Sequence, residues 1–409
     1  MPPLLRQRVF RLYWSAQSIS MLGDQITGIA LPLVGVITLK ASPAQMGVLT
    51  ALVWAPNLVL GLHAGALADR WGRRRMVMMA ADVGRALLLA SVPAAAAFGA
   101  LSMAQLYAVA FAAGSLSVFF NVSDSTLFIC IVEREDYLAA NSLVYGSRAA
   151  TFMAGPSLGG LLIQALSAPA ALLVDAASFL GSAGFLSRIA PVEPEPQPPE
   201  PGHLTAGVRF IRRTPILLYE LASVATVNFF NLAFFALFLL YAVRTLHVHA
   251  GTLGIVLGIG AIGGMLGAVV TRRLTDRIGI GPSYVVGLVL FPAPLILVPL
   301  AGGSHTLVLA LLFLAEFGSG MGVMILDITA GSINSALIPS HMRARVQGAW
   351  TIVNYGVRPL GSLAAGLAAS VFGIHATLWV ATVGGALSAL WLLPSPLPGL
   401  KVLPERAAE

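Results

Sequence analysis

The sequence has few charged residues and almost no cysteine. Charged residues make up 10% of the 409 residues, whereas soluble proteins carry roughly 25%. So few charges cannot cover a surface in water, which argues against a soluble globular protein. Cys130 is the only cysteine, so no intramolecular disulfide can form. The sequence also lacks a soluble basic surface with base-reading or stacking residues, which argues against nucleic-acid binding.

Continuous apolar runs take the place of the missing charge. Hydrophobic residues make up 57% of the chain, and the mean hydropathy is +0.85. Runs of roughly 20 apolar residues can cross a bilayer as helices, and these runs do not alternate as the strands of a membrane barrel do. The sequence predicts an all-α membrane protein with twelve transmembrane helices, at residues 10–39, 43–68, 76–99, 103–132, 138–166, 169–190, 215–244, 250–271, 283–302, 305–337, 346–371 and 375–393.

The basic residues predict the orientation. With the N-terminus inside, nineteen Lys and Arg residues fall on the inner face, and only Lys40 and Arg244 fall on the outer face. Such a positive-inside bias places both termini in the cytoplasm. The net charge of +7 then mostly reflects the basic residues that orient the chain in the membrane. Arginine far outnumbers lysine, and Ala, Gly and Pro are abundant, which is typical of a GC-rich bacterial genome. We therefore expect a multi-pass protein of a bacterial cytoplasmic (inner) membrane.

A proline-rich segment divides the spans six and six. Residues 191–203 read PVEPEPQPPEPGH, which favours extended, solvated backbone. The sequence predicts an N-terminal six-helix bundle at 1–190, a cytoplasmic linker at 191–214, a C-terminal six-helix bundle at 215–395 and a cytoplasmic tail at 396–409. The end of the linker, 204–214, is predicted to lie along the inner membrane surface as a short amphipathic helix.

The two halves repeat each other. A polar loop at 65–75 has a weaker copy at 274–279, in which Asp276 and Arg277 lie 207 residues (276 − 69) after Asp69 and Arg70. A register held through both halves predicts two pseudo-symmetric bundles, with a pathway at their interface near the bilayer midplane. Further matches at spacings of 207 and 203 are Gly47 with Gly254, Asp24 with Asn231, Gly72 with Gly279, Asp124 with Asp327, and Pro156 with Pro359.

These motifs resemble the major facilitator superfamily over the whole chain. The pattern Gly65…Asp69-Arg70…Gly72-Arg73-Arg74 is similar to that superfamily's signature loop, and Gly155-Pro156…Gly159-Gly160 resembles an element typical of its proton-coupled exporters. Three more stretches resemble the branch with enterobactin exporters and macrolide efflux proteins. They are Ser20–Asp24 with Ala30–Pro32, then Asp82–Arg85, and then Glu133–Asn141.

The polar loop is predicted to act as a gating latch, meaning a set of charges that closes the inner face. Asp69 is expected to face the N-terminus of the eleventh span, whose dipole attracts a carboxylate. The resemblance also implies that Arg73 pairs with Asp124. The alternative is that these arginines only set the topology. The weaker copy has Ile280 in place of Arg73, so its latch residues, Asp276, Arg277 and Asp327, are expected to hold less tightly.

The fifth span carries a helix bend and a face of small residues. Pro156 removes a backbone hydrogen bond, and Gly155 and Gly159 lie one turn apart, so another helix can approach closely. The resemblance pairs this span with the glycine-rich eighth span. Ordinary packing without a role in transport is the alternative. The set assigned to bends and interfaces is Gly155, Pro156, Gly159, Gly160 and Pro359.

Ionisable residues inside spans are the main functional candidates, because an unpaired charge there costs at least about 3 kcal/mol. Asp24, Arg148, Glu316 and Arg358 lie near mid-depth, and Asn228 and Asn231 add amides to the aromatic seventh span. The resemblance places the first and tenth spans at the cavity, which favours Asp24 and Glu316 for proton exchange. Alternatively, Asp24–Arg148 and Glu316–Arg358 are structural ion pairs. Asp82 and Arg85, three residues apart, are predicted to pair locally.

The sequence thus predicts a secondary active exporter rather than an enzyme. We expect it to expel a small amphipathic molecule, such as a drug, a siderophore or another natural product, by proton-coupled alternating access. The expected partners are the substrate, protons and the lipid bilayer, with no cofactor, no metal and a monomeric chain. A lipid or lysolipid translocator of the same fold, and a non-transporting membrane sensor or chaperone, remain as alternatives.

Overall fold

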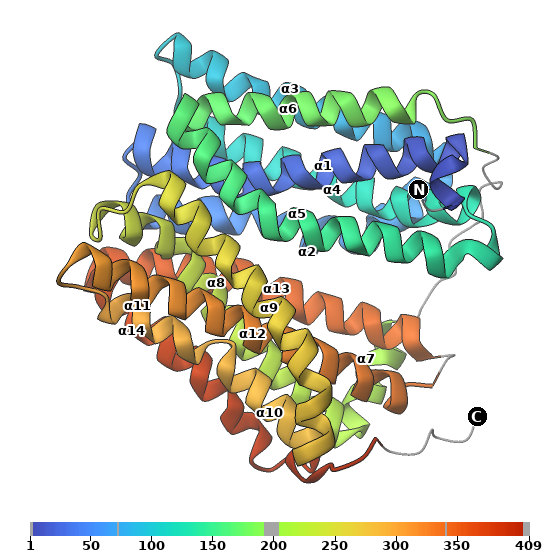
Figure 1. Ribbon diagram of the computed structural model, residues 1–409, viewed down its shortest axis with the longest axis vertical. Helices are drawn as coiled ribbons and strands as arrows, with labels where there is room; N and C mark the ends of the chain where they lie inside the picture. The colour runs from blue at the N-terminus through green and yellow to red at the C-terminus, as the bar shows by residue number, and fades with distance from the viewer. Residues whose placement is uncertain (1–2, 72, 192–203, 340–341, 404–409) are drawn as a thin grey trace. The chain divides into compact units, whose positions relative to one another are not determined.

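The computed structural model describes residues 3–71, 73–191, 204–339 and 342–403, and every regular element in these ranges is helical (Figure 1). Eleven helical stretches there are long and apolar enough to cross a membrane. Helix α13 (Arg343–Phe372) has a sufficient length of 30 residues, but arginines such as Arg358 lower its hydropathy. The predicted all-α membrane architecture is confirmed, and the predicted count of twelve spans agrees approximately with these helices.

The helices of the first half follow the predicted spans closely. Helix α3 begins after Arg73 and ends before a turn at Gly99, whose positive φ of 65° favours glycine. The α1 helix ends in a π-helical turn, η2, and a short 3-10 helix, η3, precedes α5. The elements are α1 (Arg8–Leu33), η2 (Val34–Thr38), α2 (Pro43–Trp71), α3 (Arg74–Ala97), α4 (Met103–Ile131), η3 (Arg134–Asp136), α5 (Tyr137–Leu166) and α6 (Ala168–Leu186).

The second half differs at its third span. The predicted span 283–302 is broken into three short elements, because the prolines at 292, 294 and 299 interrupt the helical hydrogen bonds. The elements are α7 (Leu204–Arg213), α8 (Pro215–Arg244), α9 (Ala250–Ile278), α10 (Ile280–Leu290), η4 (Ala293–Ile296), α11 (Leu297–Leu300), α12 (His305–Leu337), α13, α14 (Ile374–Leu387) and η6 (Ser388–Leu392).

The chain forms two compact units, which do not follow the chain order throughout. Unit 1 contains Met1–Ala41, Leu52–Glu200 and His249–Ile255. Unit 2 contains Ser42–Ala51, Pro201–Val248 and Val256–Glu409. The first turns of α2 are therefore grouped with unit 2, and the first turns of α9 with unit 1.

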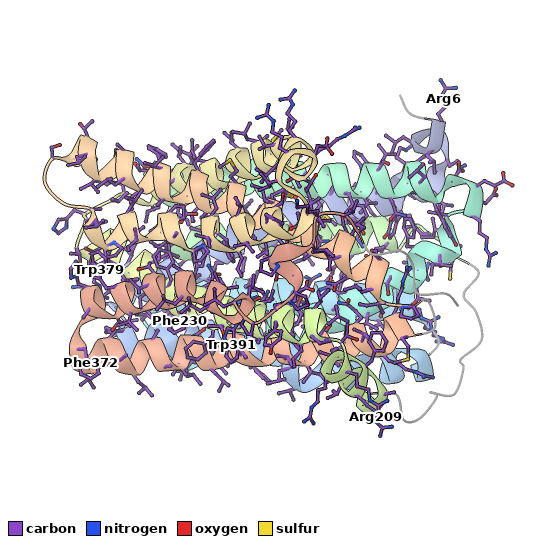
Figure 2. The ribbon with its side chains drawn as sticks, turned by 90° about the horizontal axis from the view of Figure 1, so that it is seen from below. Arg6, Arg209, Phe230, Phe372, Trp379 and Trp391 are labelled. Atoms are coloured by element: carbon purple, nitrogen blue, oxygen red, sulfur yellow. The ribbon has the colours of Figure 1, made fainter. Side chains whose placement is uncertain are left out.

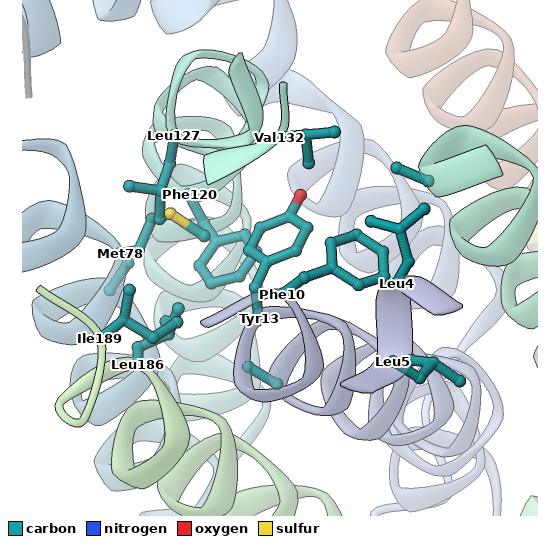
Figure 3. Packing of buried hydrophobic residues seen from close by; sticks show 13 residues of the cluster. Leu4, Leu5, Phe10, Tyr13, Met78, Phe120, Leu127, Val132, Leu186 and Ile189 are labelled. Atoms are coloured by element: carbon teal, nitrogen blue, oxygen red, sulfur yellow. The ribbon is translucent and has the colours of Figure 1, made fainter. Parts of the chain in front are cut away.

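In unit 1, helix α1 packs against α5 and α6, and α3 packs against α4 and α6 (Figure 1). Apolar side chains at one end of these helices form a core around Phe10, Tyr13 and Phe120 (Figure 3). Each of these rings is at most 4% exposed. This core fixes α1 against α4, and thereby fixes the polar residues that the two helices carry in the neighbouring turns.

In unit 2, helix α8 packs against α13 and α14, and α10 packs against α12. The short helix α7 packs on α8 and α13 through Ile211, which is buried, whereas Arg209 and Arg212 are exposed. Figure 2 shows Arg209 projecting outward from α7. The helix is thus amphipathic, as its sequence predicts.

Candidate functional site

A group of charged side chains lies inside unit 1, and Arg85 of α3 is at its centre. One turn earlier on the same helix, the Asp82 carboxylate accepts a hydrogen bond from the Arg85 guanidinium. Both side chains are buried, Arg85 at 3% and Asp82 at 0% exposure. The contact follows from helical spacing, because residues three apart lie on one face. The predicted local pair is therefore present in the structure.

A second carboxylate reaches the same guanidinium from α1. Asp24 Oδ1 lies 3.6 Å from Arg85 Nη1, and the Asp24 side chain is 48% exposed. Arg85 is thus shared between a buried carboxylate on its own helix and a half-exposed carboxylate on another helix. Because a charge facing lipid is very costly, an ionised Asp24 would need contact with water on its exposed side.

Aromatic rings enclose the guanidinium. The Cζ atom of Arg85 lies 4.6 Å from the ring centre of Phe120 on α4 and 3.9 Å from that of Phe179 on α6. Both distances fall within the range of cation–π attraction. Arg85 Nη1 also donates a hydrogen bond to Ser117 Oγ at 3.3 Å. These contacts stabilise the positive charge away from water without fixing it to one carboxylate.

A third carboxylate, Asp175 of α6, lies next to Asp24. A Cβ atom at Gly23 would clash with Asp175 Oδ1 and with Ser178 Oγ, so the glycine makes room for the buried carboxylate. Ser178 Oγ donates a hydrogen bond to Asp175 Oδ1 at 2.8 Å. We call Asp24, Asp82, Arg85 and Asp175 the charged cluster.

The charged cluster differs from a structural ion pair because its carboxyl groups outnumber its guanidinium. Three carboxyl groups and one guanidinium would carry a net charge of −2 (three negative, one positive) if all were ionised. Burying such an excess is very unfavourable, so proton binding is the natural way for the cluster to balance its charge. The group therefore has the chemistry to bind a proton.

The candidate ion pairs of the sequence analysis are not the contacts that the structure records. Asp24 pairs with Arg85 rather than with Arg148, which is exposed on α5. Arg148 lies close enough to Asp124 for its charge to act on that carboxyl group. In unit 2, the carboxyl group on which the charge of Arg358 acts is that of Asp327 rather than that of Glu316.

The remaining mid-membrane candidates lie in unit 2. The Glu316 side chain is buried on α12, and its Oε2 lies beside Gly260 of α9. On α13, the Arg358 guanidinium lies 4.8 Å from the ring centre of Tyr355. Asp327, which the charge of Arg358 reaches, is exposed on α12.

The two asparagines of the seventh span do not share one role. Asn228 Nδ2 donates to Val224 O at 2.9 Å within α8, so that amide bond is local. The Asn231 Nδ2 atom is buried and has no hydrogen-bond partner in the described part of the chain. Phe230, between them in sequence, packs against Gly384 of α14.

Only part of the predicted latch can be examined. The side chains of Asp69 and Arg70, and all of Gly72, lie outside the described residues. Asp124 of α4 accepts hydrogen bonds from Tyr13 Oη, at 2.7 Å, and from Gln17 Nε2, both on α1.

The other latch residues are exposed. Arg73 precedes α3 and forms no ion pair with Asp124 among the described contacts. Asp276 and Arg277 lie in the last turn of α9. The latch stays a prediction.

The small residues of α5 divide between two faces. Gly155 and Gly159 face α1, because Cβ atoms there would meet Gln25 and Ile26. On the other face, the Cα atom of Gly254 lies 2.8 Å from the ideal Cβ position of Gly160. The α9 helix therefore approaches Pro156 and Gly160, one position along from the pair that the sequence analysis chose.

A related contact lies within unit 2, between α13 and the first turns of α2. A Cβ atom at Gly47 of α2 would lie 2.6 Å from Ser362 O and 2.8 Å from Gly366 Cα on α13. Pro359, in the same helix, is buried. Pro156 O meets Gly254 in the first contact, and Ser362 O meets Gly47 in the second. These two residues are 206 apart (362 − 156), whereas Pro156 and Pro359 are 203 apart, so the two contacts differ in register by three residues.

Sequence reasoning missed one buried acid, Glu220 of α8. It lies six residues into the predicted span 215–244, is 0% exposed, and accepts a hydrogen bond from Asn334 Nδ2 at 3.1 Å. The available signal was an ionisable residue inside an apolar span, which is the same signal that selected Asp24. Arg85 and Asp175 carry the same signal.

Comparison with known proteins identifies the family. The family model described as Major Facilitator Superfamily matches residues 13–362 and 221–408. The chain belongs to the Major Facilitator Superfamily. The whole-chain resemblance drawn from the sequence motifs is thus confirmed. This major facilitator protein is a transport protein, not an enzyme, and it crosses the membrane several times.

Its relatives include named efflux pumps. The chain is 28% identical over 377 residues to the multidrug efflux pump Tap of Mycolicibacterium fortuitum, covering 87% of this chain and 88% of the relative. It is 26% identical over 379 residues to the pump of the same name from Mycobacterium tuberculosis strain H37Rv, covering 87% and 85%. Transporters of this family carry small molecules, which bears out the coarser part of the functional prediction.

Solved structures show the same fold. A bacterial homologue of the iron transporter ferroportin, in an inward-facing state, aligns with a TM-score of 0.74 at 16% identity, covering 94% of this chain and 98% of that one. A mutant form of the nucleoside transporter NupG aligns with a TM-score of 0.73 at 15% identity, covering 93% and 98%. At this identity the likeness concerns the fold alone.

Proposed function

We propose that this transporter is a secondary active exporter that expels a small amphipathic molecule in exchange for protons. The observation that carries the proposal is the arrangement at Arg85, whose buried guanidinium is shared between buried Asp82 and half-exposed Asp24. An exposed carboxyl group can exchange a proton with water, and a buried partner can respond to the change.

The shared arginine provides a mechanism for the exchange. When Asp24 takes up a proton, it loses its attraction for Arg85, and the guanidinium pairs with Asp82 alone. When Asp24 releases the proton, the contact between α1 and α3 is restored. Because Asp82 compensates Arg85 in both states, no unpaired cation is left buried at any stage. Proton binding can thus change how two helices of unit 1 hold together.

Asp24 is favoured over Glu316 as the coupling acid. The Glu316 carboxyl group is buried, and no cation lies within ion-pair distance of it in the described ranges. Asp24 has both an exposed side and a charged partner that can move between two carboxylates. Glu316 remains the second candidate, since it lies on the span that corresponds to the predicted cavity-lining tenth helix.

The direction of transport and the substrate class rest on the relatives. Several related proteins are named multidrug efflux pumps, which supports export of amphipathic molecules of varied structure. The structural neighbours include a nucleoside transporter and a ferroportin homologue, so the fold does not select a substrate. We therefore propose a broad class of substrate rather than one compound.

Efflux from proteoliposomes tests the proposal. Purified protein is reconstituted with ethidium as the probe, and transport is followed by fluorescence after a pH gradient is imposed. We expect gradient-driven transport by the wild type and a loss of at least about tenfold in Asp24→Asn. The exposed acid Glu135, on η3, provides the matched control Glu135→Gln, which should keep wild-type transport.

Two results would contradict the proposal. Unchanged gradient-driven transport in Asp24→Asn and in the double variant Asp24→Asn/Glu316→Gln would remove both acids from the coupling step. Movement of a fluorescent lipid between leaflets without any gradient would instead favour the lipid translocator. Binding of the probe without flux in the wild type would favour a sensor.

A further inference from the structure

We propose that Glu220 and Asn334 form a proton-binding site in unit 2, in which a neutral carboxylic acid and an amide join α8 to α12 through two hydrogen bonds. The site is separate from the charged cluster of unit 1. It does not depend on the proposed exporter function, because it concerns where a proton resides rather than what the proton drives.

The polar atoms of the Glu220 and Asn334 side chains complement each other once the acid carries a proton. Asn334 Nδ2 donates to Glu220 Oε1 at 3.1 Å. The other two polar atoms of the pair, Glu220 Oε2 and Asn334 Oδ1, are buried and have no hydrogen-bond partner among the described residues. An ionised carboxylate and an amide oxygen are both acceptors, so neither can satisfy the other. A proton on Oε2 supplies the missing donor.

The opposite orientation of the amide leads to the same requirement. Exchanging the amide nitrogen and oxygen of Asn334 would place Oδ1 beside Glu220 Oε1, again as two acceptors. A proton on the carboxyl group would then be needed at the close contact itself. The site therefore calls for a proton whichever way the amide points.

Glu220 has no counter-charge among the described residues. Glu220 is 0% exposed, and none of the described ion pairs involves it. A buried ionised carboxylate without a cation is strongly disfavoured. The charge is therefore removed most simply by protonation.

The neighbouring elements carry few groups that could replace the proton. On α10, Tyr284 Oη lies 3.4 Å from Ser223 Oγ, so it is hydrogen-bonded one turn from Glu220. On α12, Asp327 is negative when ionised and cannot compensate a carboxylate.

The described contacts of the α13 arginines lie elsewhere. Arg343 Nη2 donates to Ser335 O at 3.3 Å, and Arg345 Nη1 lies 3.9 Å from Met342 Sδ. The Arg358 guanidinium lies over Tyr355, and its charge acts on Asp327. On α7, the arginines Arg209, Arg212 and Arg213 are exposed.

Unit 1 offers an instructive contrast at a related place. There, the Asp124 carboxylate accepts from both Tyr13 and Gln17, so its surroundings consist of donors and suit an ionised group. Gln17 and Glu220 are 203 residues apart (220 − 17), the spacing that also relates Asp124 to Asp327. In unit 1 the amide, Gln17, lies on the first span, α1. In unit 2 the acid, Glu220, lies on the corresponding span, α8. Among the described contacts, the Glu220 carboxyl group has a single donor, Asn334 Nδ2, which suits the neutral acid.

The proton would act as a removable link. With the acid neutral, two hydrogen bonds join α8 near its beginning to α12 near its end. Loss of the proton breaks one of these bonds and places a negative charge beside the amide oxygen. Proton occupancy is thereby coupled to the contact between the first and fourth spans of unit 2.

Solid-state ¹³C NMR of the full chain in lipid bilayers tests the site. Glutamate is labelled at the side-chain carboxyl carbon, whose chemical shift differs between the neutral and the ionised form. At neutral pH we expect the Glu220 carboxyl carbon to give the chemical shift of a neutral acid, and this resonance should be lost in Glu220→Gln. That resonance should remain in the exposed control Glu135→Gln, and Glu316→Gln separates it from the other buried glutamate.

A second variant keeps the test decisive if Glu220→Gln does not fold. Asn334→Leu removes the amide and leaves the acid in place, so the resonance of Glu220 and the pH at which it titrates should both shift. The proposal is overturned if the resonance that Glu220→Gln removes has the shift of an ionised carboxylate. It is equally overturned if Asn334→Leu leaves the resonance and its titration unchanged.

Discussion

At the scale of single residues, function in this transporter depends on how a few buried charges are compensated. Arg85 illustrates this, because it is 3% exposed and has two carboxylate partners and two aromatic ring faces. Removing one member of a buried ion pair leaves the other charge uncompensated, which costs far more than the pair contributes. The residues of the charged cluster should therefore tolerate paired changes better than single ones.

The variant Arg85→Gln tests this directly. It leaves Asp82 buried without a cation, so we expect the free energy of unfolding to fall by about 3–5 kcal/mol. The double variant Asp82→Asn/Arg85→Gln should recover most of the loss, because neither charge remains. The exposed residue Arg188 gives the control Arg188→Gln, expected within about 0.5 kcal/mol of the wild type. Denaturation of the protein in detergent micelles measures all three; equal losses in Arg85→Gln and Arg188→Gln would refute the argument.

At the scale of helices, close packing between two helices depends on particular glycines. A periodic sequence pattern does not show which glycine faces which helix. Helix α5 has two faces of small residues, and packing assigns Gly155 and Gly159 to α1 but Pro156 and Gly160 to α9. The sequence revealed that α5 could approach other helices closely. It did not reveal which face met which helix, because both faces satisfy the same spacing rule.

A comparison of two glycines on α5 tests the contact with α9. A Cβ atom at Gly160 would lie 2.5 Å from Ala250 O and 2.8 Å from Gly254 Cα, whereas one at Gly146 would meet nothing within 4 Å. Gly160→Ala should therefore destabilise the protein by about 1–3 kcal/mol. Gly146→Ala should be neutral, or should stabilise by up to about 1 kcal/mol through helix propensity. Thermal unfolding of the two variants decides, and similar midpoints would contradict the contact.

At the scale of the whole molecule, charge asymmetry determines how the chain is inserted. The excess of Lys and Arg in one set of loops predicts that these loops are cytoplasmic. The exposed arginines of α7, including Arg209 in Figure 2, belong to this set. The loop between α3 and α4, which contains exposed Ala100, belongs to the opposite set.

The single native cysteine makes the orientation measurable. In a Cys130→Ser background, Ala100→Cys should react with a membrane-impermeant thiol reagent added to intact cells. Arg212→Cys should react only after the cells are opened, because the positive-inside rule places it in the cytoplasm. Labelling of Arg212→Cys in intact cells would reverse the proposed orientation.

The sequence alone determined the fold class, the approximate spans and the family. These properties depend on the apolar length of each run and on local motifs, both of which are written along the chain. It also determined the local contact between Asp82 and Arg85, since helical spacing fixes it. The broken third span of the second half has a visible signal in its prolines, which remove helical hydrogen bonds.

Only the tertiary structure decided which charges meet. Asp24 reaches Arg85 because α1 and α3 both pack against α6, and Glu220 reaches Asn334 because α8 and α12 bring them together from 114 residues apart. A one-dimensional pattern marks each ionisable residue as unusual but carries no information on the angle and rotation of neighbouring helices. Those packing variables bring half-exposed Asp24 to a guanidinium in unit 1 and buried Glu220 to an amide in unit 2.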